Sequence, residues 1–429
     1  MRLLRAPAAS LATSLMLSAG ALGAPASPAA AQESWPAPDP RLLARAAALL
    51  EQAPLIDGHN DLPSKLLMRA GGDPRRLDLM QPQPAMHTDL PRLRAGRVGA
   101  QFWSAYVTTD SMEDGAALRQ ALREIDMVRR LVDAYPDQLQ LARTADDVER
   151  ARRAGRIASL IGVEGGHAIE GSLSALRQLH ELGARYLTLT HSRTTEWADA
   201  TTDFPRHRGL TEFGEEVVRE MNRLGMFVDL SHVSAETMHD ALRVAVAPVL
   251  FSHSSARAIN AHPRNVPDDV LRRLPANGGV VMINFSSGFI APTAMAHAAR
   301  RDSVAESLRG LLDDPAEMAR RLRDWDEANP APRGTIGDVA DHIDHVRKLA
   351  GIDHIGIGSD YDGIRSLPVG LDDVSTYPTL FAELLRRGYG DDDVRKIAGR
   401  NLLRAMRQME QVAARLQKER AASTVDQRP

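Results

Sequence analysis

PLIDGHND (residues 54–61) joins a short apolar run to His59 and Asp61, two residues that can bind metal. In an extended strand, side chains two residues apart point to the same side. His59 and Asp61 would then face one way at the end of a buried strand, while Asn60 turns away. The alternative is a polar loop without this geometry, so the rest of the sequence has to decide between the two.

The same pattern, an apolar run that ends in a polar residue, recurs seven more times along the chain. Most of the segments between these runs have the periodicity of helices. Eight nearly continuous apolar strands, each followed by a helix, are typical of a parallel barrel enclosed by helices. The other runs are GAQFWSAYV (99–107), IASLIGVEG (157–165), ARYLTLTH (184–191), MFVDLSH (226–232), PVLFSHS (248–254), GVVMINFS (279–286) and HIGIGSDYDG (354–363).

We therefore predict an α/β fold, a (β/α)8 TIM-type barrel. An open, doubly wound sheet is the alternative, because alternating strands and helices do not by themselves show that a sheet closes. A barrel of about 250 residues leaves well over a hundred for additions. We assign the additions to an N-terminal helix at 40–52, a segment at 62–98, a long insertion at 287–335 before the eighth strand, and C-terminal helices from about 391 to 420.

The first 31 residues resemble a secretory signal peptide. Arg2 and Arg5 precede a small, apolar segment, and alanines 29–31 offer a cleavage site. We expect an exported protein, periplasmic or secreted, with residues 32–420 forming a single barrel domain and 421–429 a polar tail. An uncleaved anchor helix is the alternative, although the apolar run is short for a membrane span of about 20 residues.

The composition excludes several classes of partner and site. Acidic residues (56) and basic residues (53) nearly cancel, which does not favour nucleic-acid binding. No later stretch is long and apolar enough for a membrane span, so we do not expect an integral membrane protein after processing. The chain has no cysteine, so any metal site must use His, Asp and Glu.

Functional groups of parallel barrels lie at the C-terminal ends of the strands. Four of the 14 histidines lie at the ends of predicted strands, and three carboxylates do so as well. Counting back from His232 and His253 with the period of a strand, we expect Val228 and Phe251 to fill the barrel below them. The candidates at this rim are His59, Asp61, Glu164, His191, His232, His253 and Asp360.

Seven ionisable groups at one rim are more than a single catalytic zinc requires, since three protein ligands and a water suffice for one ion. We therefore expect two metal ions about 3.5–4 Å apart, bridged by a carboxylate and a hydroxide. A strand-end histidine taken alone is more often a hydrogen-bonded structural residue. His354 begins its strand and so belongs to the opposite end, whereas His167 is a candidate to support the ligands.

At these residues the chain resembles the membrane (renal) dipeptidase family of zinc peptidases, a branch of the amidohydrolase-like barrels. The matching segments occur in order between residues 55 and 363 and cover most of the chain after the signal-like segment. They are DGHNDLP, QFWSAY, GVEGGHAIEG, LTLTHSRTTEWAD, VDLSHVS, FSHSSARAI, RNVPDD and GIGSDYDG. The animal members carry a GPI anchor and disulfides, and this chain has neither a GPI signal nor a cysteine.

The resemblance implies a role for each candidate. Two Zn²⁺ ions are implied, and the metal ligands are His59 and Asp61 for one ion, His232 and His253 for the other, and Glu164 as the bridge. The substrate-contacting residues are His191, Arg264 and Asp360. The substrate implied is a dipeptide, with a D-residue at the C-terminal side as one option, and a homodimer is one option for the assembly.

These roles lead to a hypothesis about the reaction. A hydroxide bridging the two zinc ions attacks the peptide carbonyl, His191 stabilises the developing oxyanion, and Asp360 is the general acid and base. Arg264 holds the free carboxylate of the dipeptide, although a surface salt bridge to Asp268 or Asp269 is the plainer interpretation of this residue. Two other functions stay open: a related hydrolase of N-acyl amino acids or lactones, and a binding protein that has kept the barrel without activity.

Overall fold

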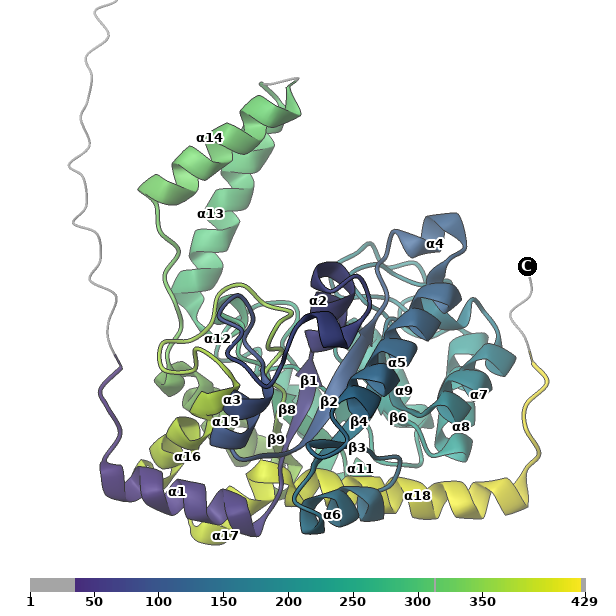
Figure 1. Cartoon of the computed structure of the whole chain (residues 1–429). Coiled ribbons are helices and arrows are strands. Elements are labelled where there is room, and N and C mark those ends of the chain that lie inside the picture. Colours follow the sequence, from purple (N-terminus) through teal and green to yellow (C-terminus); the bar gives the residue numbers. More distant parts are fainter. Residues whose placement is uncertain (1–34, 312–313, 426–429) are drawn as a thin grey trace, which may run out of the picture. The chain divides into compact units, whose positions relative to one another are not determined.

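The computed structural model describes residues 35–311 and 314–425, and within them eight parallel strands close into a barrel. Closure is shown by β2, which pairs with β4 as well as with β1. The predicted TIM-type barrel is therefore confirmed, and the open sheet is excluded (Figure 1). The barrel strands, in spatial order, are β2 (Val98–Tyr106), β1 (Leu55–Asn60), β9 (Ile355–Ile357), β8 (Val280–Ile283), β7 (Leu250–Phe251), β6 (Phe227–Asp229), β5 (Ala184–Thr188) and β4 (Ile157–Glu164).

A ninth strand, β3 (Leu139–Leu141), pairs with the start of β4 and lies outside the closed barrel. The sequence did not predict it, because three residues are too few for a strand periodicity to appear.

Most of the barrel strands end earlier than predicted. The prediction that Val228 and Phe251 fill the barrel is therefore wrong. β6 ends at Asp229 and β7 at Phe251, so the chain has left the strand before it reaches His232 or His253. Val228 and Phe251 pack in the cluster that includes the surrounding helices, whereas their neighbours Phe227 and Leu250 pack in the cluster inside the barrel. Counting back from the histidines was wrong, because the strand alternation does not continue through the loop.

Glycine makes room for the largest side chain near the site. Tyr186 points into the barrel, and a Cβ atom at Gly162 on the neighbouring strand β4 would overlap its ring. With glycine at this position, the hydroxyl of Tyr186 reaches the upper layer of the barrel, where His59 lies.

The helices cover the outside of the barrel and its lower end. α8 (Glu212–Leu224) is representative: Thr211 caps its N-terminus, Gly225 ends it at φ 79°, and one face is buried against the core. The others before the insertion are α1 (Pro40–Gln52), α2 (Leu62–Arg69), α3 (Leu90–Ala95), α4 (Ser111–Asp114), α5 (Ala117–Ala134), α6 (Ala145–Arg153), α7 (Leu173–Leu182), α9 (Ala235–Val244), α10 (Asp268–Leu271) and α11 (Leu274–Asn277).

The predicted insertion folds as helices, and α13 and α14 form a hairpin that extends past the strand ends where the site lies (Figure 1). The later helices return to the barrel, and α18 runs beneath it. Their bounds are α12 (Ser287–Ile290), α13 (Pro292–Arg309), α14 (Pro315–Ala328), α15 (Ile336–Ala350), α16 (Tyr377–Arg386), α17 (Asp391–Arg395) and α18 (Asn401–Glu419), with five short 3-10 or π segments at Pro74–Arg76, Gly166–Ile169, Ile352–His354, Val374–Thr376 and Lys396–Arg400.

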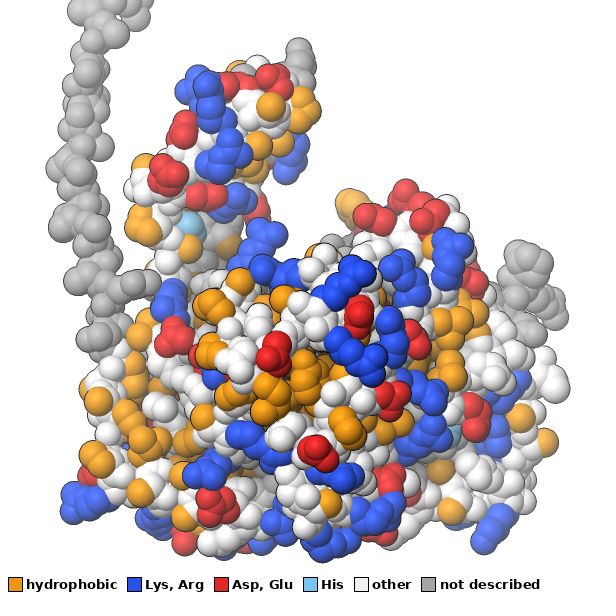
Figure 2. Space-filling model, in the orientation of Figure 1, with side chains coloured by type: hydrophobic (Ala, Val, Ile, Leu, Met, Phe, Trp, Pro, Cys, Tyr) orange, Lys and Arg blue, Asp and Glu red, His pale blue; other side chains and the backbone are white. Residues whose placement is uncertain are grey.

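The surface in Figure 2 intersperses acidic and basic side chains and shows no broad patch of one sign on this face. Within residues 35–311 and 314–425, none of the helices combines the length and the hydrophobicity that crossing a bilayer requires. The signal-like segment at 1–31 lies outside the described residues.

Candidate active site

The seven strand-end candidates converge at the C-terminal mouth of the barrel around Glu164, the last residue of β4. The two carboxylate oxygens of Glu164 face different partners. Oε2 lies 3.4 Å from Nε2 of His59, which is also 3.3 Å from Oδ2 of Asp61. Oε1 lies 2.9 Å from Nε2 of His232 and 3.4 Å from Nε2 of His253. One carboxylate therefore joins two groups of potential ligands.

Three sets of side chains each bring their ligand atoms within 4.8 Å of one another. Two of the sets share Glu164 and two share His59, so the sets are contiguous. They are His59, Glu164 and His253; Glu164, His191 and His232; and His59, Asp61 and Asp360.

The arrangement of nitrogens fits a cation. Nε2 of His232 lies only 3.0 Å from Nε2 of His253, and both face the same carboxylate oxygen. Burial lowers the pKa of both imidazoles well below the ordinary value, so both are neutral. Two imidazole nitrogens and a carboxylate oxygen this close together are a set of ligand atoms that a cation can share. Neutral imidazole is also the form that binds metal.

The imidazoles of His59 and His253 each have a hydroxyl partner at Nδ1. Nδ1 of His59 lies 2.9 Å from the hydroxyl of Tyr186, and Nδ1 of His253 lies 2.8 Å from Oγ of Ser252. Ser252 donates its hydroxyl proton to Asp229 Oδ2 at 2.7 Å, so its Oγ is free to accept from Nδ1–H of His253. In a neutral imidazole, a proton on Nδ1 of His253 leaves its Nε2 lone pair free for a metal.

His232 differs from these two. Its Nδ1 is buried, and no partner for it occurs among the residues that the structure describes. Its backbone has φ of 72°, and Asp360 has φ of 66°, a left-handed conformation that is uncommon for residues other than glycine. Both residues follow short strands, so this conformation turns their side chains back toward the mouth after the strand has ended. Strain of this kind is often found at functional sites.

A second layer of buried carboxylates lies below the mouth. Asp229 accepts from the hydroxyls of Thr188 and Ser252 and from the backbone N–H of Ser231 and Ser252, at 2.6–3.2 Å. Asp57 accepts from Gln101, Tyr377 and both the backbone and the hydroxyl of Ser359, at 2.7–2.9 Å. Burial raises the pKa of both groups, and the hydrogen bonds oppose that shift.

Asp360 and His191 lie at the upper edge of the site. Asn284 donates to Asp360 Oδ2 at 2.9 Å, which holds the carboxyl in place. Burial raises the pKa of Asp360 to about 8, with the carboxylates of Asp61 and Glu164 adding to the shift. His191 packs edge-on to Tyr106, with ring centroids 4.9 Å apart, and burial lowers its pKa.

Arg264 is a buried cation that lines the same cavity. It is 4% exposed, and burial lowers its pKa to about 10, so it stays protonated at neutral pH. Its Nη2 makes one long contact of 3.5 Å to the carbonyl oxygen of His253, and its Nη1 has no partner within the described part of the chain. The surface salt bridge to Asp268 or Asp269 does not form, since these pair with other side chains. An unpaired buried guanidinium is costly unless an anion joins it.

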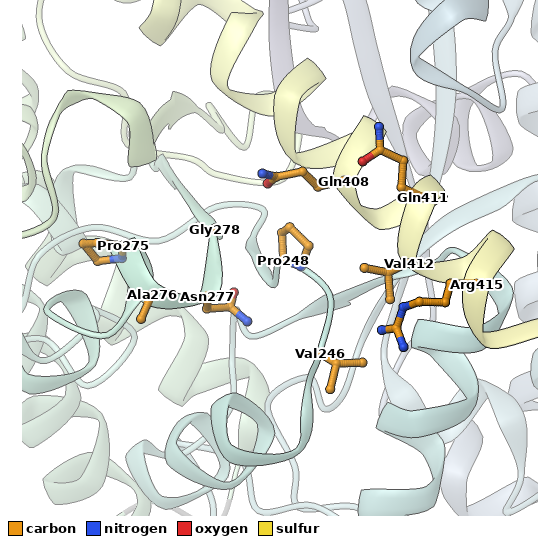
Figure 3. Close-up of a pocket in the computed structure, with 10 residues that line it drawn as sticks. All are labelled: Val246, Pro248, Pro275, Ala276, Asn277, Gly278, Gln408, Gln411, Val412 and Arg415. Carbon is orange, nitrogen blue, oxygen red and sulfur yellow. The ribbon is translucent and has the colours of Figure 1, made fainter. Parts of the chain in front are cut away.

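The cavity at the mouth has a volume of about 380 Å³, which suits a small molecule. Its lining includes Asp61, Glu164, Arg264 and Asp360. A hollow at the other end of the barrel, between Pro248 and the middle of α18, is lined instead by residues such as Ala276 and Val412, and none of its lining residues is a carboxylate (Figure 3). Of these two cavities, the one at the C-terminal mouth of the barrel is therefore the one lined by carboxylates.

Several residues of the site were not singled out from the sequence. Tyr186, Ser252 and Asp229 were counted only as parts of apolar runs, although a carboxylate inside a buried strand was a usable signal. Ser104, which donates to Glu164 Oε2 at 3.2 Å, carried no signal of its own. His167 packs its ring against Gly165 next to Glu164, and its Nε2 lies 3.1 Å from the carbonyl oxygen of Thr108, so it borders the site without facing the ligands.

The chain resembles known proteins in sequence and in fold. Residues 43–420 match the family model described as membrane dipeptidase, peptidase family M19. The chain is 43% identical over 380 residues to dipeptidase 3 of Rattus norvegicus, covering 87% of this chain and 69% of the rat protein.

Among solved structures, the probable dipeptidase PvdM from Pseudomonas aeruginosa has the same fold, with a TM-score of 0.78 at 23% identity over 87% of this chain and 100% of its own. A metallopeptidase from Rhodobacter sphaeroides, liganded with a phosphinate mimic of the dipeptide L-Ala-D-Ala, gives a TM-score of 0.69 at 26% identity over 83% of this chain and 99% of its own. The chain therefore belongs to the membrane dipeptidase family, peptidase family M19, and is a metal-dependent hydrolase of the dipeptidase type.

Proposed function

We propose that the chain hydrolyses dipeptides with two zinc ions held at the barrel mouth. The observation that carries the proposal is the position of Glu164, whose two oxygens face separate groups of nitrogen and oxygen ligands. In this proposal His59 and Asp61 hold one ion, His232 and His253 hold the other, and Glu164 bridges them. Zinc is the metal proposed because a site of imidazoles and carboxylates without sulfur accepts it readily, as it also accepts manganese or cobalt.

A bound metal pair supplies a nucleophile at neutral pH, because it lowers the pKa of a shared water and provides hydroxide. The protein then has three tasks: to position the substrate carbonyl, to stabilise negative charge on its oxygen and to move a proton. His191 is neutral and lies beside the second ligand group, so its N–H can donate to the carbonyl oxygen as charge develops there. Asp360, held by Asn284, can take a proton and pass it to the departing amine.

Substrate selection is proposed to rest on Arg264. Its buried guanidinium lacks a carboxylate partner among the described residues, and a free C-terminal carboxylate supplies one in a two-point hydrogen bond. The cavity of about 380 Å³ limits the substrate to a small peptide. The related metallopeptidase from Rhodobacter sphaeroides binds a mimic of L-Ala-D-Ala, which supports acceptance of a D-residue at the C-terminal side.

A panel of three related compounds tests the proposal: alanyl-alanine, its C-terminal amide and its N-acetyl derivative. Zinc-loaded protein should cleave the free dipeptide fastest, and loss of the carboxylate should reduce kcat/KM by about tenfold or more. Metal content measured on the same preparation should approach two zinc ions per chain. An N-acetyl amino acid and a lactone, assayed alongside the panel, test the alternative. Faster cleavage of either one than of the free dipeptide would identify the chain as another hydrolase of this fold.

We also propose that the protein is exported. The support is the N-terminal sequence, in which Arg2 and Arg5 precede a small, apolar segment and alanines 29–31. N-terminal sequencing of the protein recovered from the cell envelope or the medium should begin at about residue 32. An intact N-terminus on cell-associated protein would contradict this proposal.

A further inference from the structure

A second cavity of about 510 Å³ lies beside the site, between α12, the loop after β7 and the hairpin of α13 and α14. Two side chains, Phe289 and Ile364, line both this cavity and the one at the barrel mouth. The two cavities are therefore neighbours across a wall of apolar side chains. The proposed reaction makes no use of the second cavity.

Phe289 of this wall is in contact with Arg264, the residue proposed to bind the substrate carboxylate. The guanidinium carbon of Arg264 lies 5.4 Å from the centre of the Phe289 ring, and the ring of His262 packs at 4.3 Å from that centre. Asn265, next to Arg264 in the chain, donates to the carbonyl oxygen of Phe289 at 2.7 Å. A carboxylate bound to Arg264 would therefore lie beside Phe289, and the side chain on the adjoining carbon would begin within reach of the second cavity.

The lining of the second cavity favours apolar side chains. Ala294, Met295 and Ala298 of α13 contribute to it, together with the apolar wall. Asp326 is the single carboxylate among the described residues that line it, and Arg301 neutralises it through two hydrogen bonds of 2.7 and 2.9 Å.

The remaining charge near the cavity is positive. Arg365 is an exposed cation at the rim. His262 is neutral, because burial lowers its pKa to about 4. A substrate ammonium or guanidinium group placed here would lose water without meeting a free carboxylate, which is unfavourable.

We infer that this cavity receives the side chain of the substrate's C-terminal residue and selects large apolar side chains over basic ones. The inference rests on the proposed function, because it needs a carboxylate at Arg264. Glycine or alanine at this position leaves the cavity empty, whereas a phenylalanine or methionine side chain buries apolar surface in it. The hairpin of the insertion thus determines specificity without touching the reacting atoms.

The test compares kcat/KM for alanyl-phenylalanine and alanyl-glycine in zinc-loaded full-length protein, with alanyl-methionine and alanyl-lysine as a second pair. Ala298→Trp fills the cavity from the exposed side of α13. Ala299→Trp is the matched control, since this neighbouring alanine is also exposed on α13 but does not line the cavity.

In the wild type, the phenylalanine substrate should be preferred to the glycine substrate, and methionine to lysine, each by about tenfold or more. Ala298→Trp should lower the phenylalanine-to-glycine ratio about tenfold, mainly through KM, and Ala299→Trp should leave it unchanged. Equal ratios in the two variants, or a wild type that cleaves alanyl-lysine as well as alanyl-methionine, would overturn the inference while leaving the proposed function intact. A wild type that cleaves none of the four dipeptides would contradict the proposed function itself. The wild-type comparison needs no variant, so it decides the question even if Ala298→Trp folds poorly.

Discussion

Two layers of buried carboxylates lie in this barrel, and their surroundings differ. In the lower layer, Asp57 and Asp229 each accept at least four hydrogen bonds from neutral side chains and backbone N–H groups. In the upper layer, Glu164 and Asp61 face imidazole nitrogens instead. The protein itself satisfies the lower carboxylates, whereas the upper ones belong to clusters that could hold a metal ion. Burial alone therefore does not identify a metal site; the kind of partner does.

The largest expected effect comes from removing a ligand of the upper layer. His253→Ala should abolish retention of one zinc ion and lower kcat/KM by more than about a hundredfold, since even residues that only support ligands cost 10- to 100-fold. Metal analysis and dipeptide kinetics on the same sample measure both. His239→Ala is the control, because this exposed histidine pairs with Asp269 on the surface. Full activity with normal zinc content in His253→Ala would refute ligation.

The two carboxylates of the lower layer should differ in their effect on zinc binding. Asp229→Asn should weaken zinc binding by about 10- to 100-fold, because Asp229 orients His253 through Ser252. Both variants should lower the free energy of unfolding by a similar amount, roughly 1–3 kcal/mol. Asp57→Asn should nevertheless keep its zinc affinity, because the Asp57 side chain contacts no imidazole among the described residues. Competition with a chelator and thermal unfolding of the metal-free proteins separate the two. Equal losses of zinc affinity would show that Asp229 has only a structural role.

Substitution of Arg264, the buried cation beside the upper layer, should have a smaller effect on activity. Arg264→Lys keeps the charge but loses the planar, two-point geometry that suits a carboxylate. We expect KM for alanyl-alanine to rise about tenfold with a smaller change in kcat, as measured by steady-state kinetics. Arg272→Lys is a control, because Arg272 is exposed, pairs with Asp268 and does not line the cavity. An unchanged KM in Arg264→Lys would remove the carboxylate clamp.

Glu124 is a third kind of buried carboxyl, with neither a set of hydrogen-bond donors nor an imidazole beside it among the described residues. Its substitution should have the smallest effect, and that effect is on stability. It is 3% exposed, accepts one hydrogen bond from Ser64, and burial raises its pKa from 4.5 to about 8. A raised folded-state pKa contributes stability that is fully present below pH 4.5 and is lost as the pH rises through about 8.

Glu124→Gln removes this dependence. Its melting temperature relative to the wild type should therefore rise by about 5 °C between pH 5 and pH 9, measured on metal-free protein. Glu196→Gln, at an exposed position, is the control and should show no such trend. A constant difference in melting temperature across this range would mean that Glu124 is ionised in the folded protein.

The fold was largely predictable because its signal is local and repeated. Each barrel strand is an apolar run, and a residue type such as the histidine in PVLFSHS marks the end that carries the site. The ends of the strands were not predictable. β7 spans only Leu250–Phe251, although Val249, Ser252 and His253 beside it are buried as well. Burial therefore extends beyond the paired residues and does not mark the strand ends.

The site was predictable in its membership but not in its supporting contacts. The structure brings the seven strand-end candidates together, while their roles as ligands and catalysts stay predictions. Tyr186 gave no functional signal in the sequence, because its importance depends on its contact with His59 across the barrel. Asp229 gave only the signal of a carboxylate inside an apolar run, and its partners could not be read from that run. His232 reaches the mouth through a left-handed backbone conformation that no periodicity indicates.

The sequence by itself determined the barrel class and the set of ligand-type residues, since strand hydrophobicity and residue chemistry are properties of short segments. Only the tertiary structure decided which carboxylates are satisfied by hydroxyl and backbone donors and which face imidazoles, and which cavity adjoins Arg264. Those properties arise between residues such as Glu164, His253 and Phe289, which are distant in the chain and meet only when the barrel closes.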